Sequence, residues 1–149
     1  MGKYISKSHN KTMLLYHLVC TVKYRRDMLT KAVTDTLVNV CMEIGETSDI
    51  DFLEIGTDVN HVHFLIQTTP SYSIAQYVKL IKGRAANIIF KMNPEVKKKL
   101  WGGEFWSDGY WIVTVSKHGV KMLYGIMLKI KLKTSTTCFI NRMKISRKC

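Results

Sequence analysis

The segment His61-Val62-His63 places two imidazoles two residues apart. In an extended strand, residues i and i+2 point to the same face of the sheet. Residues 61–67 alternate as such a strand does, which puts Val62, Phe64 and Ile66 on one face and His61, His63, Leu65 and Gln67 on the other. Imidazole is a common ligand of divalent metals. The pair therefore predicts half of a metal coordination shell; the alternative is two partly buried histidines that are hydrogen-bonded to a neighbouring helix.

The elements that position this strand follow from hydrophobic spacing. Thr30 can cap a helix, and Ser73 can open a longer one that Asn93-Pro94 ends. β-rich apolar runs precede and separate these helices. The expected elements are a strand over 12–22, a helix over 30–47, strands over 50–56 and 61–67, a helix over 73–93, a strand over 110–115 and a last helix from near Val120.

This strand, helix, strand, strand, helix, strand order predicts an α+β chain with the ferredoxin-like split βαβ arrangement. The expected structure is a four-stranded antiparallel sheet with two helices on one face, plus a C-terminal helix. The histidine strand would be an inner strand. This fold hosts many unrelated functions, so the fold alone does not decide what the chain does.

Length and composition predict one domain in an aqueous, reducing compartment. The 149 residues are 46% hydrophobic and 23% charged, which are globular values. No apolar run approaches the roughly 18 residues that span a bilayer, so we expect no membrane association. The four cysteines form no C-x-x-C pair, which favours free thiols in an intracellular protein.

The net charge of +12 suggests a polyanionic partner, but the charge is unevenly distributed. Residues 117–149 contain nine Lys or Arg and no acidic residue. The preceding 116 residues contain 14 basic and 11 acidic residues. Most of the basic excess therefore belongs to the C-terminal segment, which needs an explanation of its own.

A series of short blocks surrounds the histidines in a recognisable order. They read YHLV at 16–19, KYRR at 23–26, HVH at 61–63, KGR at 82–84, LW at 100–101, FWS at 105–107 and GY at 109–110. In this order they resemble the single-tyrosine HUH transposases (transposase A type) of small insertion sequences that move through single-stranded DNA. The resemblance covers about residues 8–119.

The resemblance implies a mechanism and partners. His61 and His63, with a third polar side chain, would hold Mg²⁺ or Mn²⁺, which polarises the scissile phosphate. A tyrosine on the last helix would attack the phosphorus and form a 5′-phosphotyrosine link. The implied partners are single-stranded DNA with hairpin ends and a second copy of the chain, in a bacterial or archaeal cytoplasm at the nucleoid. We expect a homodimer, because the resemblance implies pairing through the sheets and the first strand (residues 13–22) is too apolar to be left as an exposed edge.

Basic and aromatic residues fit the DNA-binding part of this activity. Phosphate contacts are expected from Lys23, Arg25, Arg26, Lys79, Lys82 and Arg84, and base stacking from Tyr24, Trp101 and Trp106. The alternative is a solvated basic surface with tryptophans that close the core. Gly83 lies inside the second helix, where glycine is unfavourable, and would mark close approach of DNA or of another helix.

The C-terminal segment departs from the family pattern. We expect residues 1–119 to form the catalytic core and residues 120–149 to be aberrant. At the positions where the family has tyrosine and glutamine, this chain has Met127 and Lys131, and Tyr124 is the only tyrosine nearby. Restoring one nucleotide in assumed A/T-rich codons for residues 120–131 gives DENVIWNYVKNQ, which has both expected residues. A frameshift is therefore our hypothesis, and strand cleavage by this chain is expected to be impaired.

Two other functions remain open on sequence grounds. One is a non-catalytic nucleic-acid-binding module of ferredoxin-like fold, such as an RNA binder, although no K/R-G-F/Y motif is present. The other is a metal-dependent hydrolase that uses His61 and His63, for which no second carboxylate cluster is seen. Metal-dependent nicking of a hairpin oligonucleotide with covalent attachment of protein separates the transposase from both.

Overall fold

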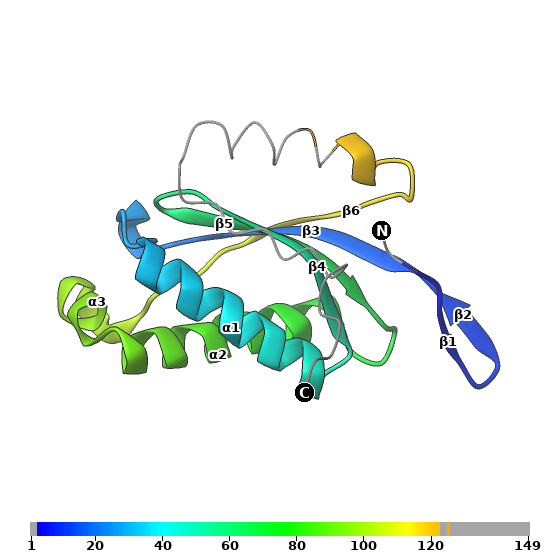
Figure 1. Cartoon of the computed structure of the whole chain (residues 1–149), viewed down its shortest axis with the longest axis horizontal. Helices are drawn as coiled ribbons and strands as arrows, with labels where there is room; N and C mark the ends of the chain where they lie inside the picture. The colour runs from blue at the N-terminus through cyan, green and yellow to red at the C-terminus, as the bar shows by residue number, and fades with distance from the viewer. Residues whose placement is uncertain (1–2, 123–124, 126–149) are drawn as a thin grey trace, which may run out of the picture.

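The computed structural model of the chain describes residues 3–122 and residue 125. The chain forms one main sheet, a small hairpin and two long helices that cover one face of the sheet (Figure 1). Its elements are β1 (Ile5–Lys7), β2 (Asn10–Thr12), β3 (Leu14–Thr21), η1 (Lys23–Arg25), α1 (Lys31–Thr47), β4 (Ile50–Thr57), β5 (His61–Thr68), α2 (Ile74–Met92), α3 (Pro94–Lys99), η2 (Trp101–Gly103) and β6 (Trp111–Thr114).

The main sheet has the strand order β4-β5-β3-β6, and every neighbouring pair is antiparallel. This is the split βαβ arrangement expected from the sequence. The histidine strand β5 is an inner strand, as expected. β3 is also an inner strand, because it lies between β5 and β6. The apolar strand β3 is covered within the chain and needs no second copy to cover it, so that ground for a homodimer is removed.

The helices α1 and α2 pack on one face of the sheet and bury its core (Figure 1). α1 begins after Thr30, whose side chain accepts a hydrogen bond from the backbone N–H of Val33 at 3.4 Å. α2 begins at a capping box formed by Ser73 and Gln76. Such caps satisfy backbone N–H groups that the first helical turn leaves unpaired, which explains why local sequence sets both starting points. Within the described residues, no helix has the length and apolarity to cross a bilayer.

The opposite face of the sheet carries a smaller apolar cluster of Leu15, Leu65 and Val120. The chain leaves β6, turns at residues 117–119 and begins a helical turn at Val120 on this side (Figure 1). That agrees with the expected start of the last helix. Because Leu65 is on the same strand face as the histidines, the C-terminal segment begins on the histidine side of the sheet.

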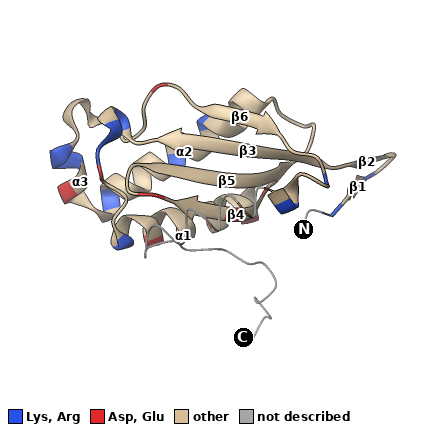
Figure 2. Cartoon of the chain, turned by 90° about the horizontal axis from the view of Figure 1, so that it is seen from above, with Lys and Arg blue, Asp and Glu red and all other residues tan. Residues whose placement is uncertain are grey.

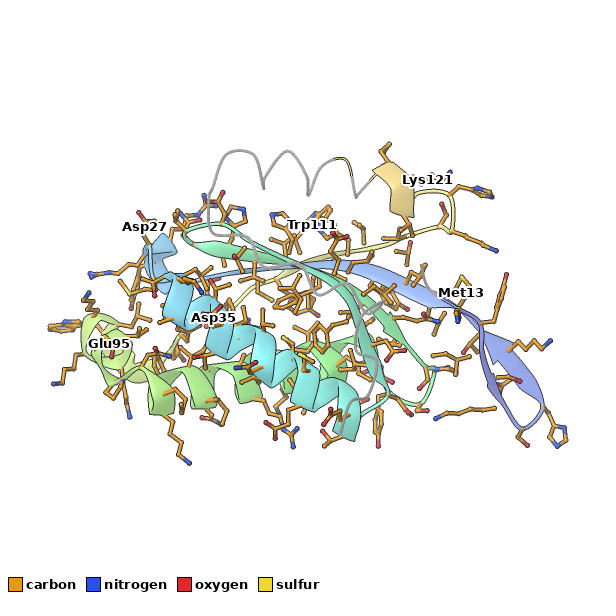
Figure 3. All side chains as sticks on the ribbon, viewed as in Figure 1. Met13, Asp27, Asp35, Glu95, Trp111 and Lys121 are labelled. Atoms are coloured by element: carbon orange, nitrogen blue, oxygen red, sulfur yellow. The ribbon has the colours of Figure 1, made fainter. Side chains whose placement is uncertain are left out.

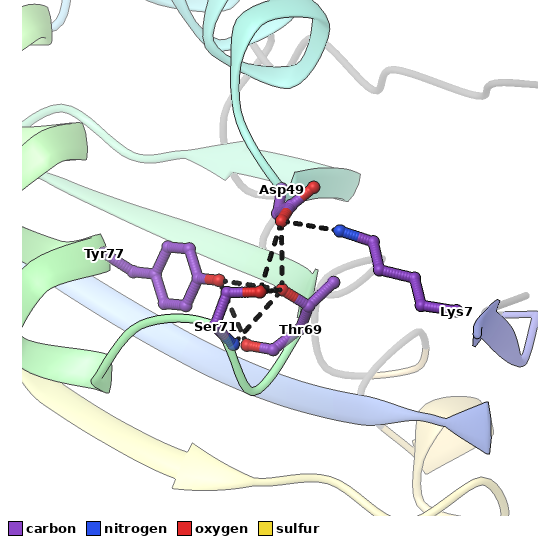
Figure 4. Close-up of polar contacts among 5 residues, drawn as sticks. All are labelled: Lys7, Asp49, Thr69, Ser71 and Tyr77. Atoms are coloured by element: carbon purple, nitrogen blue, oxygen red, sulfur yellow. Dashed lines mark hydrogen bonds and ion pairs between the residues drawn. The ribbon is translucent and has the colours of Figure 1, made fainter. Parts of the chain in front are cut away.

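A polar cluster fixes the β1–β2 hairpin, which the sequence did not predict, to the far end of the sheet (Figure 4). The ammonium of Lys7 donates to Asp49 Oδ2 at 2.9 Å, and the same carboxylate accepts from Thr69 and Ser71. The hydroxyl of Tyr77 donates to the carbonyl of Thr69 at 3.0 Å. The Lys7 hydrogen bond is the largest cause that lowers the pKa of Asp49. The Lys7–Asp49 pair is partly exposed, so it orients the hairpin while contributing at most about 1 kcal/mol to stability.

Cys20 and Cys41 are free thiols inside the core. Burial raises the pKa of Cys20 to about 12, so its reactive thiolate is absent at neutral pH. Both cysteines therefore act as small core residues. Cys138 and Cys149 lie outside the described residues.

Candidate functional site

His61 and His63 lie at the start of β5 on the sheet face opposite α1 and α2, and their ring centroids are 5.0 Å apart. The residue between them, Val62, is fully buried in the helix-side core. On the neighbouring strand, Gly56 pairs with His63, and a Cβ built at Gly56 would lie 3.9 Å from the His63 Cβ. The two imidazoles thus share one face as the strand period predicts, and no side chain from Gly56 stands beside His63.

Asn60 orients the first of these rings. Its Oδ1 lies 2.8 Å from His61 Nδ1, and an amide oxygen can only accept, so His61 Nδ1 carries the hydrogen. The lone pair of His61 is then on Nε2. The Asp58 carboxylate lies 4.0 Å from that Nε2, beyond hydrogen-bond distance. The Asn60 amide therefore holds the hydrogen on His61 Nδ1.

His17 orients the second ring. It lies on β3, and its Nε2 is 3.0 Å from His63 Nδ1. The two rings are stacked with centroids 5.2 Å apart. His63 Nε2 is buried without a hydrogen-bond partner. When His63 donates through Nδ1–H to His17, the Nε2 lone pair of His63 is left free, which is the state that binds a metal.

The protonation state of this group suits metal binding. Burial, followed by the proximity of His61 and His17, lowers the pKa of His63 to about 4. Burial also lowers the pKa of His17. Both rings are therefore neutral at physiological pH, and a metal can bind without first displacing a proton from either of them.

Trp111 closes the β6 side of this face. Its ring meets His17 edge-on with centroids 5.3 Å apart, and it pairs in register with Val19, which in turn pairs with His63. Figure 3 shows Trp111 on the side of the sheet away from α1 and α2. His17, His63 and His61 thus form a row of rings that Trp111 ends. The row spans two strands and is continued by β6.

The side chains present fit a divalent cation in part. The imidazoles of His61 and His63 face one side of the sheet, and the buried His63 Nε2 has no other partner. Among the described residues, no group of three or more His, Cys, Asp or Glu side chains could hold a metal. A complete shell therefore needs a further donor of another type, from substrate, from water or from the segment outside the described residues.

The expected nucleophile region is not part of the described structure. Tyr124, Met127 and Lys131 lie outside the described residues. The described residues lead as far as the helical turn at Val120, which packs with Leu15 and Leu65 on the histidine side.

Lys23 and Lys82, expected at DNA phosphates, both bind a loop of this chain. Lys82 Nζ donates to the carbonyls of Ser107, Asp108 and Gly109, at 2.7, 3.3 and 3.2 Å. Lys23 Nζ lies 2.6 Å from Glu104 Oε2, and this hydrogen bond is the largest cause that raises the pKa of Lys23. The two ammonium groups therefore hold the segment that leads into β6.

Of the remaining cations, Arg25, Arg26 and Lys79 have exposed side chains, and Arg84 donates to Thr47 Oγ1 at 3.0 Å. Figure 2 shows lysines and arginines gathered at the end of the molecule that carries α3. A groove of about 680 Å³ between α2 and segment 103–110 is lined in part by Lys79, Lys82 and Gly83. Apart from its chain neighbours and the backbone of its own helix, no atom lies within 4 Å of a Cβ built at Gly83, so no other element of the described chain approaches it.

The tryptophans divide between the core and the surface. Trp106 is 5% exposed, and its Nε1–H donates to the carbonyl of Lys82 at 3.1 Å. The structure therefore corrects the expectation that Trp106 stacks on bases, because its ring closes the core. Trp101 is 82% exposed and Tyr24 is 64% exposed. Both rings are available to a ligand.

Comparisons of sequence agree with the blocks around the histidines. The profile of the family described as "Transposase IS200 like" matches residues 10–126. The ISDra2 transposase TnpA of Deinococcus radiodurans is 37% identical over 105 residues, which are 70% of this chain and 75% of the relative. The transposase for insertion sequence element IS200 of Salmonella typhimurium is 26% identical over 122 residues, 82% of this chain and 80% of the relative.

Solved structures show the same fold. A crystal structure of a candidate transposase from Deinococcus radiodurans R1 superposes with a TM-score of 0.70 at 28% identity, over 85% of this chain and 97% of that one. A REP-associated tyrosine transposase bound to a REP hairpin superposes with a TM-score of 0.60, over 86% of this chain and 74% of that one. Its identity is 9%, so it supports the fold alone. The family match over residues 10–126 contains both histidines and the strands β2 to β6. This chain therefore belongs to the IS200-like transposase family.

Proposed function

We propose that this chain is a single-tyrosine HUH transposase that acts on single-stranded DNA with hairpin ends, and that His61 and His63 are its metal ligands. The observation that carries the proposal is the shared face of two imidazoles, of which His61 is hydrogen-bonded to Asn60 and His63 to His17. The unpartnered His63 Nε2 is the atom that this arrangement leaves for a ligand.

Mg²⁺ or Mn²⁺ at this site would polarise the scissile phosphate and stabilise the charge that develops on it. The residues of the chain hold and orient the ion. His61 and His63 would supply nitrogen donors. Asn60 holds the hydrogen on His61 Nδ1, and His17 does the same for His63 when it accepts from Nδ1–H. Lys23 and Lys82 hold the loop before β6, which supports Trp111 next to His17.

Strand cleavage by the chain as written is proposed to be impaired. In the family, the attacking group is a tyrosine on the last helix, and the corresponding slot holds Met127. Tyr124 is a weak candidate, because three residues along a helix rotate a side chain by about 60° from the Met127 direction and displace it by about 4.5 Å. A chain without a nucleophile would still act as a nucleic-acid-binding module, which is the second candidate function.

DNA binding is proposed to use exposed cations near the histidine site and along α2. Arg25 and Arg26 follow β3, and Lys79 and Arg84 lie on α2. Lys23 and Lys82 contribute indirectly, through the loop that they hold. Neutralised phosphates make such binding salt-dependent and insensitive to sequence.

The proposed assembly is a homodimer, as the family resemblance implies. Within the described residues the sheet edges are β4 and β6, and β6 exposes Trp111 and Val113. Unpaired strand edges are surfaces through which chains associate. Light scattering at micromolar concentration tests this, and a monomer would contradict it. Action on DNA would place the protein in a bacterial or archaeal cytoplasm, at the nucleoid.

The function is tested with a labelled single-stranded hairpin oligonucleotide and Mn²⁺. We expect hairpin binding that weakens with added salt, and at most a trace of covalent protein–DNA product. That trace should vanish in His61→Ala and in His63→Ala. His9→Ala removes an exposed histidine in the β1–β2 turn and is the matched control. Absence of binding to hairpin and to linear DNA alike would overturn the proposal.

A further inference from the structure

Tyr24 and Arg25 adopt left-handed backbone conformations, with φ of 57° and 50°. This region is unfavourable for residues that have a Cβ, and it is an outlier for an aromatic residue. Within the described residues Ser8 is the one other non-glycine with positive φ, in the β1–β2 turn. Two consecutive strained residues persist only where their surroundings fix them, and such strain concentrates at functional sites.

Hydrogen bonds on both sides fix this turn. The backbone N–H of Val22 donates to the carbonyl of Asn60 at 2.9 Å, and that of Lys23 donates to the carbonyl of Phe105 at 2.8 Å. The turn itself closes through Arg25 N–H to the carbonyl of Val22 at 2.9 Å. Val22 is fully buried. The backbone of the turn is therefore anchored in the core at its first residue and tied to two separate segments.

The side chains that the turn presents are not held in the same way. Tyr24 is 64% exposed, and Arg25, Arg26 and Asp27 are also exposed. The ammonium of Lys23 lies 5.8 Å from the centre of the Tyr24 ring. The ring therefore buries little apolar surface, and its packing cannot offset the strain of its backbone. The strained turn displays an aromatic face between cationic groups.

The turn also lies next to the histidine site. Thr21, at the end of β3, pairs with His61, and the turn begins at the next residue, Val22. Asn60 joins the two features, because its carbonyl accepts from Val22 and its side chain accepts from His61. Asn60 thus connects the turn that carries Tyr24 to His61.

We propose that the turn of residues 22–26 is a binding site for an unpaired nucleobase next to the phosphate that His61 and His63 address. The Tyr24 ring stacks on the base, and Arg25 and Arg26 neutralise the flanking phosphates. This inference rests on the proposed function, since it requires a single-stranded DNA substrate. Stacking is tolerant of sequence, because every base has a π-face, so the site would hold the strand in place rather than read it.

Glycine substitutions test this without loss of the turn. Glycine adopts positive φ readily, so Tyr24→Gly and Arg25→Gly relieve strain while each removes one side chain. Binding is measured on a single-stranded oligothymidylate and on an abasic oligonucleotide of equal length, in EDTA so that metal does not contribute. The control is Tyr4→Ala, because Tyr4 is 62% exposed and also lies 5.8 Å from a lysine ammonium.

For Tyr24→Gly we expect an unchanged or higher melting temperature and a loss of about 5- to 150-fold in affinity for oligothymidylate, with the salt slope unchanged. The difference from wild type should disappear on the abasic strand, and Tyr24→Trp should bind like wild type. Arg25→Gly should instead reduce the salt slope by about 0.7. Tyr4→Ala should change neither the affinity nor the slope.

If wild type binds oligothymidylate and Tyr24→Gly binds within about twofold of it, the inference is overturned and the proposed function stands. A Tyr24→Gly loss that persists on the abasic strand also overturns it, because a base would not be what the ring contacts. A lower melting temperature in Tyr24→Gly would mean that the Tyr24 ring stabilises the folded chain by packing, against the inference. A wild-type chain that binds neither strand overturns the proposed function and this inference together.

Discussion

Replacing His17 tests whether the second histidine ring is oriented from the neighbouring strand. His17→Leu removes the 3.0 Å contact between His17 Nε2 and His63 Nδ1 and fills the space with an apolar side chain. We expect Mn²⁺ to bind about tenfold more weakly, within the 10- to 100-fold range that is typical of residues that orient a metal ligand. His61 keeps its own partner, Asn60, so one ligand stays preorganised and binding is weakened rather than lost.

The magnitude can be checked against the hydrogen bond itself. A neutral intramolecular hydrogen bond contributes about 0.5–1.5 kcal/mol, and tenfold in affinity corresponds to about 1.4 kcal/mol. Stability should change by less than this. His17→Leu leaves His63 Nδ1 without a partner, but it also removes His17 Nδ1, a buried nitrogen that has no partner in the native chain. His17→Leu should therefore lower the Mn²⁺ affinity clearly while it changes the unfolding free energy little.

Titration calorimetry with Mn²⁺ at pH 7.5 measures the affinity, and urea denaturation in EDTA measures the stability. The matched variant is His17→Gln, whose amide oxygen can accept from His63 Nδ1 and should recover most of the affinity. Equal Mn²⁺ affinity in wild type and His17→Leu would refute the reasoning. So would a His17→Gln variant that binds as weakly as His17→Leu, since the accepting atom would then be irrelevant.

Three further predictions follow from particular residues. Gly83→Ala should raise the unfolding free energy by up to about 1 kcal/mol, because Gly83 is inside α2 with no atom within 4 Å of the added Cβ; denaturation checks it, and a loss of stability would contradict it. The metal-free chain should lose stability as pH falls from about 6.5 towards about 4, because the pKa of His63 is lower in the folded state than in the unfolded state. The contribution of neutral His63 to stability is complete above this pH window and is lost as the ring is protonated. Denaturation at each pH should show a shallower decline for a His63→Asn chain. Sequencing of the coding DNA should show codons for residues 120–131 that restore DENVIWNYVKNQ when one nucleotide is added; robust covalent product that disappears in Tyr124→Phe would count against the frameshift.

The main elements could be predicted because their signals are local. Thr30 and Ser73 are helix caps that the sequence displays directly, and the apolar periodicity of α1 and α2 fixes which faces they bury. The short helix α3 was not among the expected elements, because its lysine-rich sequence has a single buried residue, Val96. The β1–β2 hairpin is short and polar, and Lys7–Asp49, a contact distant in sequence, fixes it to the rest of the chain.

The site was less predictable, because its partners meet through strand register. The spacing of His61 and His63 is enough to place them on one face. The role of His17 depends on β3 lying beside β5 with His17 opposite Leu65, and neither the strand order nor that register can be read from local spacing. Lys82 was expected at DNA because its charge lies off the apolar stripe of α2, yet a long side chain can turn to nearby carbonyls.

The central claim is that His61 and His63 together bind a divalent metal, and pulsed electron paramagnetic resonance of bound Mn²⁺ tests it most directly. In protein labelled with ¹⁵N-histidine, we predict couplings from two imidazole nitrogens in wild type, from one in His61→Ala or His63→Ala, and from none in the double variant. His9→Ala should give the wild-type spectrum. Bound Mn²⁺ that shows no histidine nitrogen coupling, or a coupling that survives in the double variant, would contradict the assignment of these two residues.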